Sequence, residues 1–191
     1  FVDNGDITSD IFLNDKVKIL EMNSKSGLYP LYMAYSIYML NINGKEQDVP
    51  FEKAQEIWYQ TIKDHIFVLC KTIMAKQITR RTLVGYSGKE INAIYLTKLI
   101  EERMKDIPRL TNKLTNPLTW NKGGDRMKFD AIVGNPPYQL ENNGEGNGKN
   151  PIYHLFMDSA TALAPIVTFI HPARFLFGAG KTPKAWNDKM L

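Results

Sequence analysis

A short apolar segment that runs directly into two consecutive prolines constrains this chain more than any other feature. Residues 129–134 read Phe-Asp-Ala-Ile-Val-Gly, and Asn135-Pro136-Pro137-Tyr138 follows. A brief apolar run bounded by turn residues is typical of a strand buried in a parallel sheet. In open α/β sheets, ligands bind beyond the carboxyl ends of the strands. The sequence therefore predicts an α/β fold in which this tetrapeptide stands at a ligand site.

The tetrapeptide offers hydrogen-bond acceptors and few donors. Each proline fixes its own φ, lacks an N–H group and pushes the preceding residue toward extended geometry. The side-chain oxygen of Asn135 and the carbonyl of Pro136 could accept both hydrogens of a planar amino group and draw its nitrogen toward a nucleophilic geometry. Tyr138 could stack on the ring that carries this amino group. The structural alternative is a proline-stiffened turn. The candidate catalytic residues are Asn135, Pro136, Pro137 and Tyr138.

These residues resemble the catalytic motif of S-adenosylmethionine-dependent amino-methyltransferases. The likeness is greatest to the DNA adenine methyltransferases of restriction-modification systems, and among those to the bifunctional methylases. In that family the Asn side chain and the first Pro carbonyl bind the adenine amino group, and the aromatic residue stacks on the flipped-out base. The resemblance implies these roles for Asn135, Pro136 and Tyr138, and double-stranded DNA as the partner. Protein-glutamine and some RNA guanine methyltransferases share the tetrapeptide, so the substrate stays open.

An earlier segment has the pattern of a nucleotide-like cofactor site. Residues 17–21 read as a short strand that ends in an acid, residues 22–27 as a small polar turn, and residues 28–40 as a nearly all-apolar, buried helix. Such a turn lets a ligand approach the backbone, and the helix N-terminus offers free N–H groups. An ordinary strand-to-helix turn is the alternative.

By position this unit resembles the family's first cofactor motif, Asp-Pro-x-x-Gly-x-Gly. Lys25 departs from that motif, because it stands where the first glycine is usual. The resemblance implies that Glu21, Asn23 and Gly27 hold the methionine part of S-adenosylmethionine. It also leads us to expect a ribose-binding acid after the strand at 66–70, where Lys-Thr-Ile follows instead, so that acid stays unassigned.

The remaining segments alternate between helix and strand patterns. We predict strands over 66–70 and 165–172, and helices over 51–65, 87–104 and 152–163. The usual fold has a third strand between 104 and 126, but no clear apolar run supports one, so either this strand is short or the region is remodelled. The glycine- and asparagine-rich stretch 139–150 is either a loop that closes over substrate or a surface insertion.

Composition narrows the class of protein. Twenty-four Lys and Arg against twenty Asp and Glu give a net charge of +4, which suits nucleic acid but does not require it. Residues 71–89 hold five basic residues and no acid, and they either contact phosphates or form a solvated surface. The single cysteine, Cys70, is predicted to be a buried thiol, and the three scattered histidines indicate no metal site. No signal peptide or membrane span is visible, so we expect a cytoplasmic protein.

Together these patterns predict a single catalytic domain over residues 1–191, with a Rossmann-like methyltransferase fold and a mostly parallel, doubly wound sheet. The missing recognition domain and final hairpin lead us to expect a truncated piece of a longer chain, whose other portions could include a nuclease, a helicase or a target-recognition domain. The predicted function is methyl transfer from S-adenosylmethionine to the exocyclic amino group of a flipped-out adenine in a restriction-modification system. A protein-glutamine or RNA amino-methyltransferase, or a degenerate non-catalytic module, is the alternative.

Overall fold

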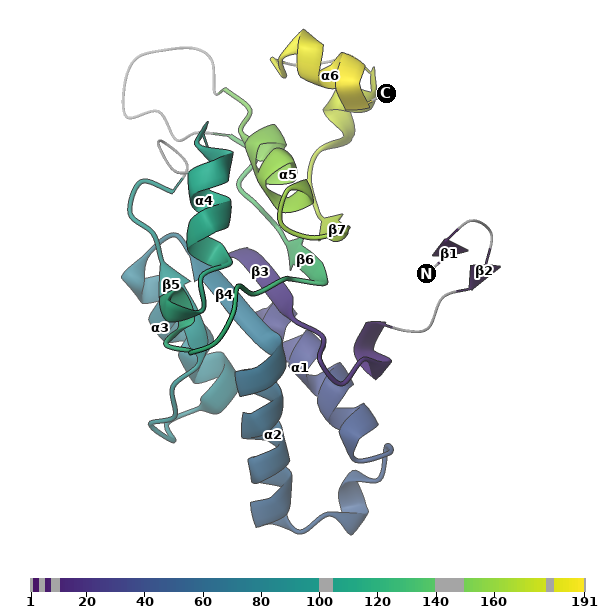
Figure 1. The fold of residues 1–191 in the computed structure, drawn as a ribbon, viewed down its shortest axis with the longest axis vertical. Coiled ribbons are helices and arrows are strands. Elements are labelled where there is room, and N and C mark those ends of the chain that lie inside the picture. The colour runs from purple at the N-terminus through teal and green to yellow at the C-terminus, as the bar shows by residue number, and fades with distance from the viewer. Residues whose placement is uncertain are drawn as a thin grey trace.

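Five parallel strands form the central sheet (Figure 1). The computed structural model describes residues 2–3, 6–7, 11–99, 105–139, 150–177 and 181–190. The strand order is β5-β4-β3-β6-β7, and every neighbouring pair runs parallel. The strands are β3 (Ile19–Ser24), β4 (Ile66–Cys70), β5 (Asn92–Tyr95), β6 (Ala131–Gly134) and β7 (Ile166–Phe169). Two short strands, β1 (Val2–Asp3) and β2 (Asp6–Ile7), make a separate antiparallel pair.

Helices connect the strands and cover the sheet on both faces, so the sheet is doubly wound (Figure 1). The α-helices are α1 (Leu28–Asn41), α2 (Phe51–His65), α3 (Ile73–Val84), α4 (Ile107–Leu114), α5 (Tyr153–Thr161) and α6 (Lys184–Met190). Short 3-10 turns are η1 (Ile11–Leu13), η2 (Glu46–Asp48), η4 (Pro117–Trp120) and η5 (Ala173–Phe177). No helix in the described part of the chain is long and apolar enough to cross a membrane.

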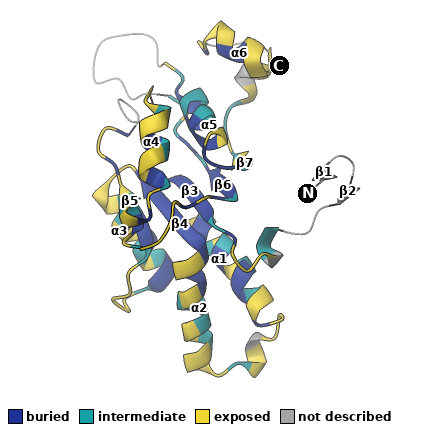
Figure 2. Ribbon diagram, in the orientation of Figure 1, coloured by how far each residue is buried: buried dark blue, intermediate teal, exposed yellow. Residues whose placement is uncertain are grey.

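Successive side chains of a strand point to opposite faces of the sheet, so alternate residues join two separate hydrophobic cores. Leu20 and Met22 of β3 join the core under α4, η4 and α5. Ile19 of the same strand joins the core under α1, α2 and α3. Because both faces are covered, β3, β4 and β6 are buried at every position, as Figure 2 shows for the centre of the sheet.

The register between β3 and β6 is set by a reciprocal contact at their amino ends. The backbone N–H of Lys18 donates to Oδ2 of Asp130 at 2.7 Å, and the backbone N–H of Asp130 donates to the Lys18 carbonyl at 2.9 Å. From there Ile19 pairs with Ala131 and Glu21 pairs with Val133. This alignment brings the carboxyl ends of the two strands level with each other.

Most predicted elements are confirmed. The strand at 66–70 and the helix at 51–65 have the predicted bounds, and strands and helices occur in the predicted segments around 131, 153 and 166. The helix predicted over 28–40 is present as α1, but it is not buried all round. Leu28 and Tyr32 are 63% and 64% exposed, whereas Ala34 and Ile37 face the core.

Between residues 87 and 126 one prediction is wrong, and of the two alternatives for 104–126 the remodelled region is the one observed. The helix predicted over 87–104 is absent from the described residues, because Asn92–Tyr95 forms β5 and pairs with β4. This strand is the third strand that the usual fold has between 104 and 126. That later segment holds α4 and η4 instead. Pairing with β4 thus outweighed the helix-like spacing of apolar residues in this segment.

Candidate active site

The two predicted site segments meet at the carboxyl ends of β3 and β6. These strands are neighbours at the centre of the sheet, and the chain order reverses between them, since β4 and β5 lie on one side and β7 on the other. In open α/β sheets a crevice forms at such a reversal. The turn after β3 and the tetrapeptide after β6 therefore open onto the same edge of the sheet.

Gly134 brings the tetrapeptide close to β3. A Cβ atom at this position would stand 2.6 Å from the carbonyl oxygen of Met22, so no side chain fits here without a shift of the backbone. On its other side, the Gly134 carbonyl accepts a hydrogen bond of 3.1 Å from the N–H of Ile170. The end of β6 is thus held between two neighbouring chain segments directly before Asn135.

The four residues of the tetrapeptide differ in exposure. Pro136 is buried and Asn135 and Pro137 are half-buried, whereas Tyr138 is 38% exposed. Within the described ranges no residue hydrogen-bonds to the Asn135 amide, which leaves its oxygen available to a ligand. The Tyr138 carbonyl accepts a hydrogen bond of 3.0 Å from the N–H of Ile152, so the segment after the motif is tied to the start of α5.

The predicted cofactor turn begins later than the sequence indicated. Strand β3 continues to Ser24, and the pairing with β4 shifts between Met22 and Ser24. Asn23 is the extra residue of this bulge and has a φ of 71°. Asn tolerates this left-handed region better than most residues. Asn23 is buried, the strand ends one residue later at Ser24, and Gly27 forms the N-cap of α1 with a φ of 79°.

Gly27 lies where a larger residue would collide with α3. A Cβ atom on Gly27 would be 3.0 Å from Cα of Thr79 and 3.1 Å from its Cγ2. Its carbonyl accepts the N–H of Leu31 at 3.0 Å, and no side chain caps the first turn of α1. Uncapped amide groups at a helix N-terminus favour a negatively charged ligand group.

Glu21 is a buried carboxyl without full hydrogen bonding. Only 4% of the residue is exposed, and Oε2 has no hydrogen-bond partner among the described residues. Burial raises the pKa of Glu21 from 4.5 to about 7, and a hydrogen bond with Ser24 lowers it in part. A buried orphan oxygen is costly in a folded protein, so its retention indicates a site that a ligand completes.

The end of β4 contains no acid, as its sequence showed. Cys70 is a fully buried thiol, as predicted, and burial raises its pKa to about 12. Lys71 is exposed, and Thr72 accepts the N–H of Ala75 at 3.1 Å and caps α3. The residues that hold a ribose in the resembling family therefore have no counterpart directly after this strand.

Side chains that follow β7 lie beside the start of α5. The ring of His171 stacks on Tyr153, with centroids 5.6 Å apart and an interplanar angle of 3°. Tyr153 directly follows Ile152, which binds the Tyr138 carbonyl. His171 is thus linked to Tyr138 of the tetrapeptide through Tyr153 and its neighbour Ile152. The Arg174 side chain, which follows His171 after β7, and most of the glycine- and asparagine-rich stretch 139–150 lie outside the described residues.

The predicted basic stretch is partly engaged within the protein. Arg80 donates from Nε to the Lys89 carbonyl at 3.1 Å, and the Arg81 guanidinium lies 4.7 Å from the centroid of the Tyr86 ring. Lys71 at the end of β4 is exposed. A phosphate-binding role for this stretch stays a prediction.

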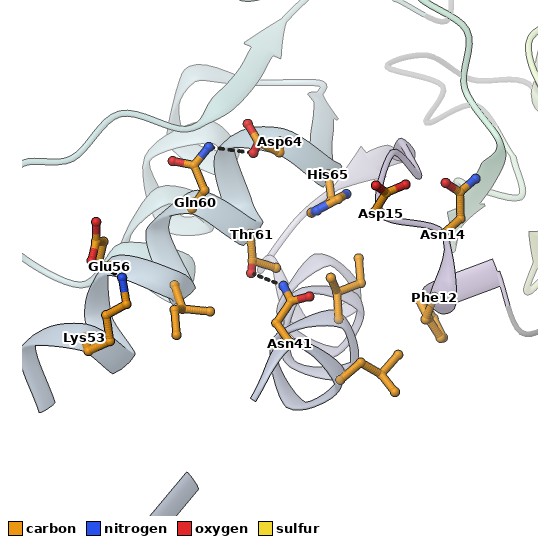
Figure 3. A pocket seen from close by; sticks show the side chains of 13 residues that line it. Phe12, Asn14, Asp15, Asn41, Lys53, Glu56, Gln60, Thr61, Asp64 and His65 are labelled. Atoms are coloured by element: carbon orange, nitrogen blue, oxygen red, sulfur yellow. Dashed lines mark hydrogen bonds and ion pairs between the residues drawn. The ribbon is translucent and has the colours of Figure 1, made fainter. Parts of the chain in front are cut away.

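A cavity of about 610 Å³ lies at the opposite end of the sheet, between α1, α2 and the segment at 12–15 (Figure 3). It borders the amino ends of β3 and β4, because His65 directly precedes β4 and hydrogen-bonds to the Val17 carbonyl at 2.7 Å. Asn41 donates to Thr61 at 3.3 Å within it. The cavity lies away from Asn135, so it is not part of the candidate site.

Sequence reasoning missed Ser24 and Thr79 as residues of this region. Their hydroxyl oxygens are 2.9 Å apart and buried. Thr79 lies on a helix 55 positions later in the chain, and no local pattern connects it with the turn. Only the packing of α3 against the end of β3 reveals it.

The fold and the site define a class of protein. A five-stranded parallel sheet with this order, an Asn-Pro-Pro-Tyr tetrapeptide after β6 and a strand-turn-helix unit at β3 together form a Rossmann-like methyltransferase fold. Residues 64–191 match the Eco57I restriction-modification methylase family. The chain belongs to this family, whose members are methyltransferases.

One relative adds a finer similarity. The chain is 35% identical over 110 residues to a Mycoplasma pneumoniae (strain ATCC 29342 / M129 / Subtype 1) protein described as an "uncharacterized adenine-specific methylase". The alignment covers 55% of this chain and 26% of the relative, so the chain spans about a quarter of the relative's length. The family match includes the tetrapeptide and begins after the strand-turn unit that contains Glu21, Asn23 and Gly27.

Proposed function

We propose that the full-length protein transfers a methyl group from S-adenosylmethionine to the exocyclic amino group of adenine in double-stranded DNA, as part of a restriction-modification system. One observation carries the proposal. The Asn-Pro-Pro-Tyr segment begins at the carboxyl end of β6, beside the strand that holds the orphan carboxyl of Glu21. Family membership and the description of the Mycoplasma pneumoniae relative support adenine as the target.

In this proposal Asn135, Pro136, Pro137 and Tyr138 form the catalytic segment. The Asn135 side-chain oxygen and the Pro136 carbonyl accept the two hydrogens of the target amino group, which directs its lone pair toward the methyl donor. Pro137 stiffens the segment and keeps Pro136 extended. The acceleration comes from polarisation and in-line placement, without a covalent enzyme intermediate.

The target base must leave the duplex to reach these acceptors. Extrusion costs a few kcal/mol of stacking and pairing, and an aromatic side chain that stacks on the extruded base offsets part of it. Tyr138 is the partly exposed aromatic residue of the segment, and its backbone is held by Ile152. We assign the stacking role to its ring.

The residues of the β3 turn fit the cofactor. When bound, S-adenosylmethionine supplies an activated methyl group on a sulfonium. Glu21 has a free carboxyl oxygen that can accept from the methionine ammonium, and Asn23 shapes the bulge that ends the strand. Gly27 allows the close approach of the turn to α3 and leaves the first amides of α1 uncapped. We propose that these three residues hold the methionine part.

A degenerate, non-catalytic module is the second candidate. Two observations favour it: Lys25 occupies a position where the resembling motif has glycine, and Cys70-Lys71-Thr72 supplies no acid after β4. Loss of cofactor binding in the full-length protein would support this candidate.

The test is a map of modified bases in DNA from cells that lack other adenine methylation and express the full-length protein. We expect methyladenine at one recurring sequence, and its loss with Asn135→Ala. Asn112→Ala is a matched control, because it removes an amide from the surface of α4 whose hydrogen bond from the Arg126 guanidinium, 2.8 Å long, is exposed to solvent. DNA without methyladenine, from a wild-type protein that binds S-adenosylmethionine in calorimetry, would reject the adenine proposal and direct the search to protein and RNA substrates.

A further inference from the structure

Four buried polar side chains lie together beneath the turn that leads into α1. Glu21, Ser24, Cys70 and Thr79 each expose 4% or less of their surface. Ser24 Oγ and Thr79 Oγ1 are hydrogen-bonded at 2.9 Å. The Ser24 hydroxyl also lowers the pKa of Glu21, and the Thr79 hydroxyl lowers the pKa of Cys70. The cluster includes side chains of β3, β4 and α3 at the carboxyl edge of the sheet.

The Ser24 hydroxyl directs its proton toward Glu21 when this group is ionised. A carboxylate only accepts hydrogen bonds, and a hydroxyl that lowers its pKa does so as a donor. Each hydroxyl has one proton, so Thr79 then donates to Ser24 at 2.9 Å. Glu21 Oε2 keeps no hydrogen-bond partner in the described part of the chain.

Helix α3 also supports the turn sterically. The position of a Cβ on Gly27 is 3.0 Å from Thr79 Cα and 3.2 Å from Thr82 Cβ. Thr82 Oγ1 donates to the Ser26 carbonyl at 2.6 Å. The same face of α3 thus contacts the turn through its backbone, its methyl groups and its hydroxyls.

We propose that Thr79 is a positioning residue of the cofactor site, whose hydroxyl holds Ser24 against Glu21 and so leaves Glu21 Oε2 available to the methionine part of S-adenosylmethionine. The inference rests on the proposed function, in which Glu21 and Gly27 hold that cofactor. Thr79 itself is fully buried, so it acts through its hydrogen bond to Ser24 and through its close packing against Gly27. It is distinct from the residues that contact the ligand.

Two substitutions in the full-length protein separate positioning from packing. Thr79→Val keeps the shape and removes the hydroxyl, whereas Thr79→Ser keeps the hydroxyl and removes the methyl group. We expect Thr79→Val to weaken S-adenosylmethionine binding about tenfold in calorimetry, the effect of one lost hydrogen bond. Thr79→Ser should retain the wild-type affinity within about twofold, because the hydrogen bond to Ser24 remains.

A second readout needs no ligand. The pKa of Glu21 is measured by carbon NMR of labelled glutamate carboxyls, with the signal assigned through Glu21→Gln. Thr79→Val should raise this pKa, because Ser24 loses the donor that orients its hydroxyl toward the carboxylate. Ser24→Ala removes the same bond from its other end and should raise the pKa as well, which keeps the test valid if Thr79→Val fails to fold.

The outcomes separate this inference from the proposed function. An unchanged Glu21 titration in Thr79→Val, or a shift of equal size in Thr79→Ser, would overturn the positioning role even if thermal stability falls. A wild-type protein that does not bind S-adenosylmethionine would overturn the proposed function, and the cofactor part of this inference with it. A raised pKa and weaker binding in Thr79→Val, both restored in Thr79→Ser, would establish the role.

Discussion

Gly134 lies against the backbone of Met22, so closely that a Cβ on Gly134 would stand 2.6 Å from the Met22 carbonyl oxygen. The contact joins the end of the strand before Asn135 to the strand that contains Glu21. Gly134→Ala must therefore separate β6 from β3. We expect it to lower the free energy of unfolding by about 1–3 kcal/mol, the usual cost of overpacking a buried site. Urea titration of the full-length protein measures this.

Gly123→Ala provides the matched control for this steric argument. No atom lies within 4 Å of a Cβ at Gly123, and its φ lies outside the left-handed region. We expect this substitution to change stability by less than about 0.5 kcal/mol. Equal stability of the two variants would refute the close approach of β6 to β3.

The hydrogen bonds of Asn92 predict that its substitution destabilises the protein. Its buried side-chain amide donates to three backbone carbonyls, those of Ile62 at 3.3 Å, Lys63 at 2.9 Å and Ile66 at 2.8 Å. It thereby binds the Lys63 carbonyl in the last turn of α2, where helix carbonyls lack intrahelical partners, and joins it to the Ile66 carbonyl at the start of β4. We expect Asn92→Asp to cost more stability than Asn92→Ala, because a buried carboxylate would face carbonyl oxygens.

Thermal unfolding at pH 8 measures this order. The variant Asn112→Ala on the surface of α4 should melt close to the wild type, because the hydrogen bond that it loses, from Arg126 to Asn112, is exposed to solvent. If Asn92→Asp proved as stable as the wild type at that pH, the amide's role at the end of α2 would be wrong.

Asn92 also shows why part of the fold could not be predicted from the sequence. Local spacing around Ile91, Tyr95 and Leu99 fits a helix, and this led to the wrong helix over 87–104. The strand at 92–95 forms because β4 offers a buried edge and because Asn92 bonds to carbonyls some 26 to 30 positions earlier. Segments with strong local patterns, such as 51–65 and 66–70, were predicted with their observed bounds.

In the candidate site, too, some residues could be predicted from local sequence, whereas others are revealed only by contacts between distant segments. The tetrapeptide and the strand before it are contiguous, so the sequence placed them at the carboxyl edge of the sheet. The role of Ser24 and Thr79 depends on contact between a strand end and a distant helix. The bulge at Asn23 was missed because its φ follows from the pairing of β3 with β4.

Glu21 makes stability depend on pH. Its pKa rises from 4.5 to about 7 on folding, chiefly through burial. Between these values the folded state holds a proton that the unfolded state has released, so the free energy of unfolding decreases as the pH rises from about 4.5 to about 7. Above that range the full cost of the buried charge remains, on the order of 3 kcal/mol.

Glu21→Gln should remove this dependence. We expect the variant to match the wild type near pH 4 and to be more stable at pH 8, by up to about 3 kcal/mol. Paired urea titrations at the two pH values measure the difference. A constant difference between the proteins across this range would show that Glu21 titrates normally.

Tyr138 is the residue on which the base-stacking role can be tested separately from the amide and carbonyl acceptors. Its ring is partly exposed, and its backbone carbonyl is held by Ile152, a bond that side-chain substitution leaves intact. We expect Tyr138→Phe to keep most of the activity, because stacking uses the ring. Tyr138→Ala should lose about 1–3 kcal/mol of stacking, which lowers kcat/KM for the mapped DNA site by about 5- to 150-fold.

Fluorescence of 2-aminopurine at the target position measures base extrusion directly, because this base brightens when it leaves the stack. The wild type and Tyr138→Phe should brighten it on binding, and Tyr138→Ala should do so less, since the extruded state loses its aromatic partner. If Tyr138→Phe were as defective as Tyr138→Ala, the hydroxyl and not the ring would be the functional group. If Tyr138→Ala kept wild-type kcat/KM, another side chain would hold the base, and His171, two contacts away through Tyr153 and Ile152, would be the next to substitute.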